Sequence, residues 1–210
     1  MNLRTMGRFT AVALLVLAMT GCSLLTGPKE APPRRYWILT SNDATPASGL
    51  ATALPEASIG VGPFRFPSYL ENPNLVRRTE PNEIAFWARN RWAEPLREGF
   101  LRILGKNLAN DVGTNRVVLF PWYEVELAYQ VQGEVLRFEV NDSGQVILQC
   151  GWALSRPSDQ KVLAVRSFDK SLAADRTDPE EVAQKMSELL EELAEDITQT
   201  IREAVNEAAS

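Results

Sequence analysis

The chain has 210 residues, with 22 basic side chains against 27 acidic ones, two cysteines and no histidine. This length fits one domain with appendages, and an apolar content of 45% is ordinary for a globular protein. The lack of histidine excludes the nucleophile and zinc sites that need an imidazole. A net charge of −5 disfavours nucleic acid as a partner, because phosphate is held mainly by Lys and Arg. Composition therefore disfavours an enzyme.

The N-terminus has the pattern of an export signal. Arg4 and Arg8 come before a short apolar stretch, which cannot cross a bilayer as a helix. Small residues then precede Cys22, which resembles the lipobox of bacterial lipoproteins, where the thiol is diacylated and becomes the mature N-terminus. We therefore predict a signal peptide over residues 1–21 and lipidation of Cys22; the alternative is an uncleaved signal anchor. Ser23 follows the cysteine where an Asp would favour the inner membrane, so the resemblance points to the outer membrane and its periplasmic face.

A short proline-rich tether is predicted to follow the lipidated cysteine, over residues 22–34. Twelve residues of extended chain span at most ~40 Å, which is enough to lift a domain clear of the lipid headgroups. Two or three acyl chains hold a protein to a bilayer stably. The globular part is then expected over residues 35–210.

The apolar patterning of that part predicts several strands and two helices. Strands are expected over 36–40, 57–62, 75–78, 84–89, 117–120, 127–131, 136–140, 145–154 and 162–168. Pro63 should end regular pairing of the second strand. The alternation of apolar residues changes parity near Gly133, which suggests a bulge or a bend there. Asn141–Gly144 is expected to form a hairpin turn.

The two predicted helices differ in length. The first should run from about Pro95 to Asn110, and the second should be a long C-terminal helix capped by Asp178, with Glu181 completing a capping box. Its apolar stripe consists of Val182, Met186, Leu189, Leu190, Leu193, Ile197, Ile201 and Val205. The sequence thus predicts a single α/β domain with a mixed β-sheet flanked by helices, including this long amphipathic one.

Sites for covalent chemistry are not evident. Cys150 lies among alternating apolar residues and is interpreted as a buried small hydrophobe, since no base is available to activate its thiol. Gly99–Asn107 superficially resembles a phosphate-binding loop but falls inside the first predicted helix. No metal-type spacing of Cys or Asp occurs, so we expect no metal and no cofactor.

One stretch, Pro63–Glu98, interleaves arginines with aromatic residues. Such surfaces are enriched at protein interfaces, and lipid headgroups are a second candidate partner. The alternative is that the tryptophans are core and the arginines simply solvated. Our candidates for a partner-binding face within and beside this stretch are Tyr69, Leu70, Arg77, Arg78, Arg91 and Trp92.

Several motifs in the chain are similar to those of a known family: Val61–Pro63, Pro67–Leu70, Pro73–Arg78, Arg91–Leu96 and Asn107–Leu108. On these residues the chain resembles the PqiC/YmbA family of ABC-type transport auxiliary lipoproteins. The likeness extends from the lipobox to the terminal helix. It implies a mixed-sheet α/β domain and a place in a lipid-transport system that crosses the periplasm and supports membrane integrity.

The resemblance also implies the partners. An MCE-domain protein would form a conduit from an inner-membrane permease, and the lipoprotein would dock or receive the far end of that conduit. No covalent chemistry is expected. A cell-envelope scaffold that binds an outer-membrane or cell-wall partner is the alternative, and whether the subunits form a homo-oligomer stays open.

Overall fold

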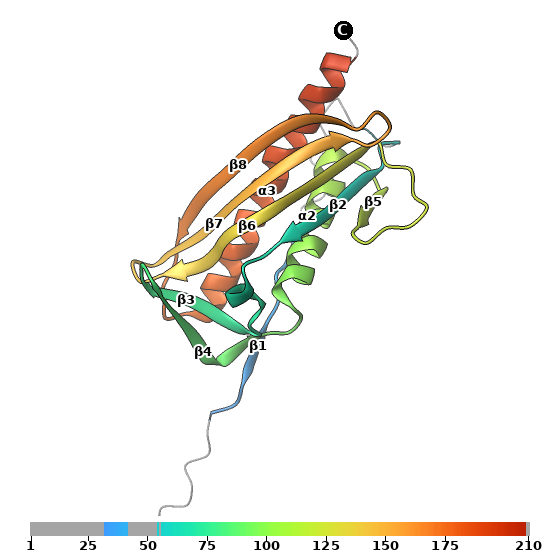
Figure 1. The fold of residues 1–210 in the computed structure, drawn as a ribbon. Helices are drawn as coiled ribbons and strands as arrows, with labels where there is room; N and C mark the ends of the chain where they lie inside the picture. The colour runs from blue at the N-terminus through green and yellow to red at the C-terminus, as the bar shows by residue number, and fades with distance from the viewer. Residues whose placement is uncertain (1–31, 42–53, 55, 209–210) are drawn as a thin grey trace, which may run out of the picture. The chain divides into compact units, whose positions relative to one another are not determined.

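The computed structural model describes residues 32–41, 54 and 56–208. Within them lie eight strands, two α-helices and one 3-10 turn (Figure 1). The strands are β1 Arg35–Trp37, β2 Ile59–Arg65, β3 Asn74–Glu80, β4 Glu83–Trp92, β5 Val117–Leu119, β6 Tyr129–Asn141, β7 Gln145–Arg156 and β8 Lys161–Ala173. The helical elements are η2 Ser68–Glu71, α2 Leu96–Val112 and α3 Pro179–Ala208.

All eight strands belong to one mixed sheet, and β6 is its centre. β7 pairs antiparallel along one edge of β6, and β8 pairs with β7. Two strands share the other edge of β6: β2 pairs parallel near Tyr129, and β3 pairs parallel near Asn141. β5 extends the sheet beyond β2, while β4 and β1 extend it beyond β3. β1 and β5 therefore lie near opposite ends of β6.

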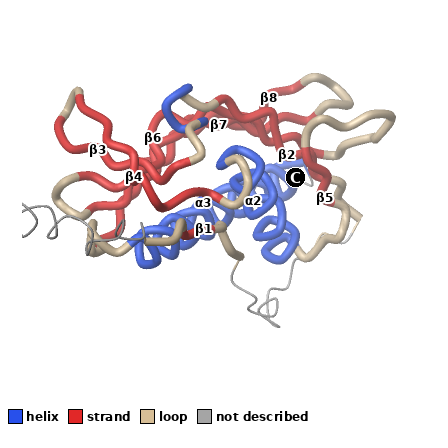
Figure 2. Tube along the Cα trace, turned by 90° about the horizontal axis from the view of Figure 1, so that it is seen from below, coloured by secondary structure: helices blue, strands red, loops and turns tan. Residues whose placement is uncertain are grey.

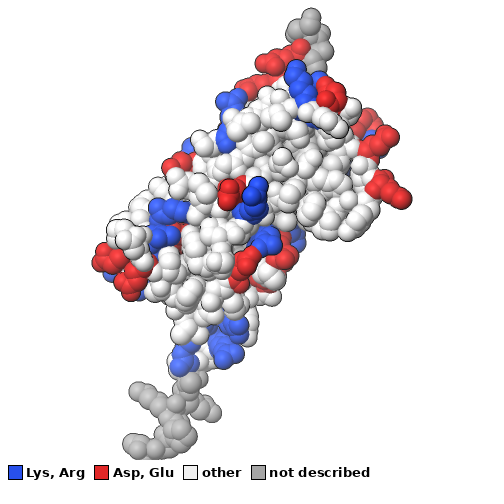
Figure 3. Space-filling model, viewed as in Figure 1, with Lys and Arg blue, Asp and Glu red and all other residues white. Residues whose placement is uncertain are grey.

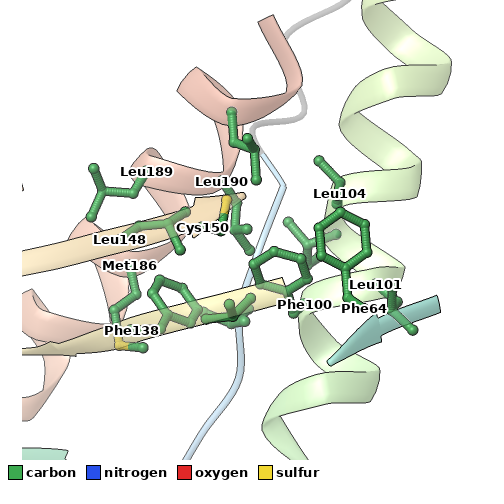
Figure 4. Packing of buried hydrophobic residues seen from close by; sticks show 14 of the residues in the cluster. Phe64, Phe100, Leu101, Leu104, Phe138, Leu148, Cys150, Met186, Leu189 and Leu190 are labelled. Carbon is green, nitrogen blue, oxygen red and sulfur yellow. The ribbon is translucent and has the colours of Figure 1, made fainter. Parts of the chain in front are cut away.

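Both helices lie against the same face of the sheet (Figure 2). The core lies between the helices and the sheet and is centred on Phe100 of α2. The centroid of its ring lies 5.3 Å from that of Phe64 and 5.8 Å from that of Phe138 (Figure 4). α3 buries the apolar stripe expected from its sequence, from Val182 to Ile201. The α/β fold class and the long terminal helix are confirmed, with both helices on one side.

Two predicted strands end at other residues than the structure shows. β2 continues through Pro63 to Arg65, because the proline falls in a register shift between Val61 and Phe64 where no ladder hydrogen bond is required of it. β1 ends at Trp37, before the predicted limit at residue 40. Beyond that point side chains satisfy the backbone: Thr40 N–H donates to the Ser187 hydroxyl at 3.1 Å.

The parity change in β6 occurs, but later than predicted. Against β7 the register shifts between Val135 and Arg137, and Leu136 is left exposed instead of joining Phe138 in the core. Gly133 lies opposite the irregularity in β2.

The N-terminal cap of α3 is also partly different. Asp178 accepts a hydrogen bond from Glu180 N–H at 2.9 Å, as expected of an N-cap. Glu181, however, accepts from the N–H of Asp175 and not from that of Asp178. The carboxylate reaches one turn further back, so the predicted capping box is wrong in its second partner.

Candidate partner-binding surfaces

The structure does not gather the six predicted partner-binding residues on one surface. Leu70 and Trp92 belong to the core, with exposed fractions of 1% and 6%. Their side chains are occupied in packing and are not available to a partner. Tyr69 and Arg78 lie together at the junction of η2, β3 and β6, and Arg77 is their half-buried neighbour in β3.

Arg91 belongs to a different part of the sheet. It pairs in register with Tyr36 of β1 and with Asn74 of β3. It therefore lies next to β1, several residues along β3 from Arg78.

Tyr69 and Arg78 converge on a carboxylate that the sequence did not single out. The side chain of Glu139 in β6 is completely buried. Oε1 accepts hydrogen bonds from Nε of Arg78 and Nε of Arg137, both at 2.9 Å. Oε2 accepts from the Tyr69 hydroxyl at 2.9 Å and from Phe138 N–H at 3.0 Å. We call Tyr69, Arg78, Arg137 and Glu139 the Glu139 cluster.

The Glu139 cluster is arranged for structure and not for proton transfer. Four donors occupy the carboxylate, and Arg78 also donates to the Pro81 carbonyl at 3.0 Å. Burial, followed by the charge of Glu139, raises the pKa of the Tyr69 hydroxyl to about 12, so the phenol stays protonated at neutral pH. The cluster thus fixes η2 and β3 onto β6 and makes the adjoining surface rigid.

A second surface, missed by the sequence analysis, consists of the end of β5 and the loop that follows it. It exposes the apolar side chains Leu119, Phe120, Tyr123 and Val125, with Tyr123 80% exposed. We call these four residues the apolar loop. Exposed apolar clusters of this kind mark interaction sites more often than scattered single residues do. The only sequence signal is an apolar run that continues past the end of a short strand, and such a run normally predicts burial.

Glycines hold the apolar loop close to the domain. A Cβ at Gly60 of β2 would come within 2.5 Å of the Leu127 side chain, and one at Gly62 within 2.7 Å of Phe120. A Cβ at Gly105 of α2 would meet Leu119 at 2.7 Å. The loop is therefore seated on backbone that only glycine leaves open. A fixed apolar surface has little conformational entropy to lose on binding.

The face of the sheet opposite the helices carries a groove of about 460 Å³ between β2, β6, β7 and β8. Its lining includes Gly151, where a Cβ would meet nothing within 4 Å, and charged side chains at Arg65, Glu134 and Arg166. Around these charges the face is largely uncharged (Figure 3). The groove mixes opposite charges, and it does not by itself select a ligand.

The thiol of Cys150 is buried, as predicted, with 1% of the residue exposed. Burial, followed by the charge of Asp196, raises its pKa to about 12, so the nucleophilic thiolate is not formed near neutral pH. Gly99–Asn107 lies within α2, as the sequence analysis expected. Among residues 32–41, 54 and 56–208, no group of three or more Cys, Asp or Glu side chains is placed to hold a metal ion.

The predicted lipidation site, Cys22, lies outside the described residues. Over the part of the chain that the structure describes, neither helix is both long enough and apolar enough to span a bilayer.

Comparison with known proteins places the chain in a family. The family model of the ABC-type transport auxiliary lipoprotein component matches residues 39–198. Among solved structures, XCC0632 from Xanthomonas campestris matches with a TM-score of 0.66 at 17% identity, covering 83% of this chain and 99% of that one. A second structure, of an uncharacterised protein, has the same TM-score and identity and covers 80% and 99%. These two structures support the fold alone.

No curated protein matches significantly. The family match spans most of the chain. It includes most of α3 and every strand of the sheet except β1. The chain therefore belongs to the family of ABC-type transport auxiliary lipoprotein components.

Proposed function

We propose that this protein is a periplasmic lipoprotein, anchored in the outer membrane through Cys22, that docks the far end of an MCE-type conduit in intermembrane lipid transport. The conduit would connect it to an inner-membrane permease. Its role would be mechanical: it holds a partner in place and supports membrane integrity without covalent chemistry. The family match over residues 39–198 is the observation that carries this proposal.

Two surfaces are candidates for the docking face. The first is the surface of Tyr69 and Arg78, which the Glu139 cluster holds rigid against β6. The second is the apolar loop, which offers more exposed apolar area. Acidic Glu124 lies within this loop and Glu126 follows it. A protein partner with an apolar pocket and a basic rim would fit the apolar loop. Buried apolar and aromatic anchors carry most of the energy of such interfaces.

Photocrosslinking in intact cells tests both surfaces together. A photoreactive residue is placed at Tyr69, at Tyr123 of the apolar loop, or at Gln184, which is exposed on α3 outside both surfaces. Adducts are identified by mass spectrometry. Adducts with an MCE-domain protein at Tyr69 or Tyr123, and none at Gln184, would support conduit docking and indicate which surface is used.

The cell-envelope scaffold is the competing function, and the same experiment separates the two. Adducts only with barrel proteins or cell-wall components would favour the scaffold. The anchor is tested separately, by labelling cells with radioactive palmitate. Label in the wild-type chain and none in Cys22→Ser supports lipidation, whereas label that survives the substitution contradicts it.

A further inference from the structure

The described domain begins with a basic and aromatic edge. Arg34, Arg35 and Tyr36 are exposed, and Ile38 is 49% exposed two residues later. β4 lies alongside in parallel register, so that Tyr36 is opposite Arg91, and the exposed Arg89 is two residues earlier in β4. We call Arg34, Arg35, Tyr36, Ile38, Arg89 and Arg91 the β1 edge. Figure 3 shows Lys and Arg side chains grouped at this end of the domain.

Local contacts hold the β1 edge in place. The Arg35 guanidinium stacks over the Trp37 ring at 4.3 Å, and the indole N–H of Trp37 donates to Asn90 Oδ1 at 3.1 Å. Arg35 also forms an ion pair with Glu180 of α3. Its Nη2 lies 3.5 Å from Glu180 Oε2, and both side chains are exposed. Such a pair is weak, so Arg35 remains able to attract an anionic surface.

We propose that the β1 edge binds the anionic phospholipid surface of the membrane that holds the lipid anchor. The chemistry fits this partner. Arginines attract anionic headgroups, and tyrosine with an aliphatic neighbour suits the interface between headgroups and acyl chains. The proposal rests on the proposed lipidation of Cys22, because twelve residues of tether keep Arg34 within ~40 Å of that membrane.

Contact through the β1 edge also sets an orientation. β3, β4 and β1 are joined to β6 near Asn141, whereas β2 and β5 are joined near Tyr129. The 13 residues of β6 correspond to roughly 43 Å of strand. With the β1 edge on the membrane, the apolar loop after β5 lies at the far end of the domain, where a conduit would arrive (Figure 1).

The test measures vesicle binding by the chain from residue 23 onward, which has neither the signal nor Cys22. This chain keeps the complete core, because every buried apolar residue of the described structure lies between Leu39 and Ile201 and residues 34–210 form one compact unit. Binding is measured by co-sedimentation with vesicles of phosphatidylcholine alone or with phosphatidylglycerol added. The variant Arg34→Gln/Arg35→Gln is compared with Arg65→Gln/Lys161→Gln, which removes the same charge at exposed positions outside the β1 edge.

We expect binding to the anionic vesicles that is roughly 25-fold weaker in Arg34→Gln/Arg35→Gln, about fivefold per cation. The control pair should change binding less than twofold. Salt at about 0.5 M should abolish binding of the unsubstituted chain, because it screens charges at the membrane surface. Circular dichroism confirms that both variants are folded. Equal binding to neutral vesicles, equal loss in both variants, or no binding would each overturn the proposal. The test uses an unlipidated chain and no conduit. Its result therefore does not depend on whether the proposed conduit docking is correct.

Discussion

Two carboxylates, one on the sheet and one between the helices, show how differently this fold treats charge taken out of water. Glu139 on β6 is completely buried, and four donors saturate its oxygens. Asp111 on α2 is only half-buried, yet its Oδ2 has no hydrogen-bond partner. Arg202 of α3 lies nearby but donates instead to the Asp111 carbonyl, at 2.7 Å.

The difference teaches that depth alone does not decide what a buried charge does, because hydrogen-bond partners can compensate for burial. Burial, followed by the charges of Glu195 and Glu191 on α3, raises the pKa of Asp111 to about 6, and Arg202 offsets only part of that effect. Three acids therefore face one another across the α2–α3 contact. The Glu139 cluster joins three segments that are distant in sequence, whereas the Asp111 site weakens the contact that contains it.

The largest expected effect comes from removing the better-satisfied carboxylate. Glu139→Ala leaves two arginines facing each other without their counter-ion, which should lower the free energy of unfolding by about 3–5 kcal/mol. Urea denaturation followed by circular dichroism measures it. Glu134→Ala, at an exposed position of the same strand, should change stability by less than about 0.5 kcal/mol. A similar small change for Glu139→Ala would contradict a structural role for the cluster.

This cluster also marks the limit of what the sequence could predict. The two helices, most strands and the hairpin turn at Asn141–Gly144 were predictable, because their signals are local: a period of 3.6 or 2, a cap, or a glycine with positive φ. Glu139 gives no such signal. In a strand that alternates, a charged residue beside Phe138 is expected on the solvent side, and its burial depends on partners 61 and 70 residues away.

Exposure of apolar residues was unpredictable for the same reason. Leu70 and Trp92 were expected at a surface because they lie near arginines in the sequence, but both belong to the buried hydrophobic core. The apolar loop, in contrast, has a sequence that predicts burial, and nothing in the described chain covers Tyr123. Local patterns therefore identified elements well and surfaces poorly.

The two arginines of the Glu139 cluster should not be equivalent. Arg78 also donates to the Pro81 carbonyl and contacts the Tyr69 hydroxyl, while the hydrogen bond of Arg137 is to Glu139. We expect Arg78→Met to cost about 2–3 kcal/mol and Arg137→Met about 1 kcal/mol in unfolding free energy. In the double variant the cost should exceed the sum, since the carboxylate then has no cation. Strict additivity in a double-mutant cycle would count against a shared network.

A loss smaller than that of Arg78→Met is expected when the Tyr69 hydroxyl is removed. Tyr69→Phe keeps the ring but removes the donor to Glu139 Oε2, which should cost about 1.5 kcal/mol. Thermal and urea denaturation measure the change. Tyr123→Phe is the matched control, because that hydroxyl belongs to an 80% exposed side chain and its removal should leave stability unchanged. Equal effects of the two substitutions would show that the Tyr69 hydroxyl bond contributes little.

The smallest expected change in stability comes from Asp111→Asn, which should stabilise the protein where the other substitutions destabilise it. Because the pKa of Asp111 rises from 3.8 to about 6 on folding, the folded state holds this proton more tightly than the unfolded state does. Stability from this group is therefore present below about pH 4 and lost as the pH rises through 6. Asp111→Asn removes the penalty, and at pH 7.5 it should stabilise the protein by about 1 kcal/mol after allowance for solvent screening of a half-exposed group.

The pH dependence separates this explanation from a simple gain in helix packing. Urea denaturation at pH 7.5 and near pH 4 should show the advantage of Asp111→Asn at the higher pH and its disappearance at the lower one, where the native carboxyl is already neutral. Asp169→Asn, an exposed substitution on β8, should give no such difference. An advantage that persists at the lower pH would assign the gain to packing, and the contrast between the two carboxylates would then rest on Glu139 alone.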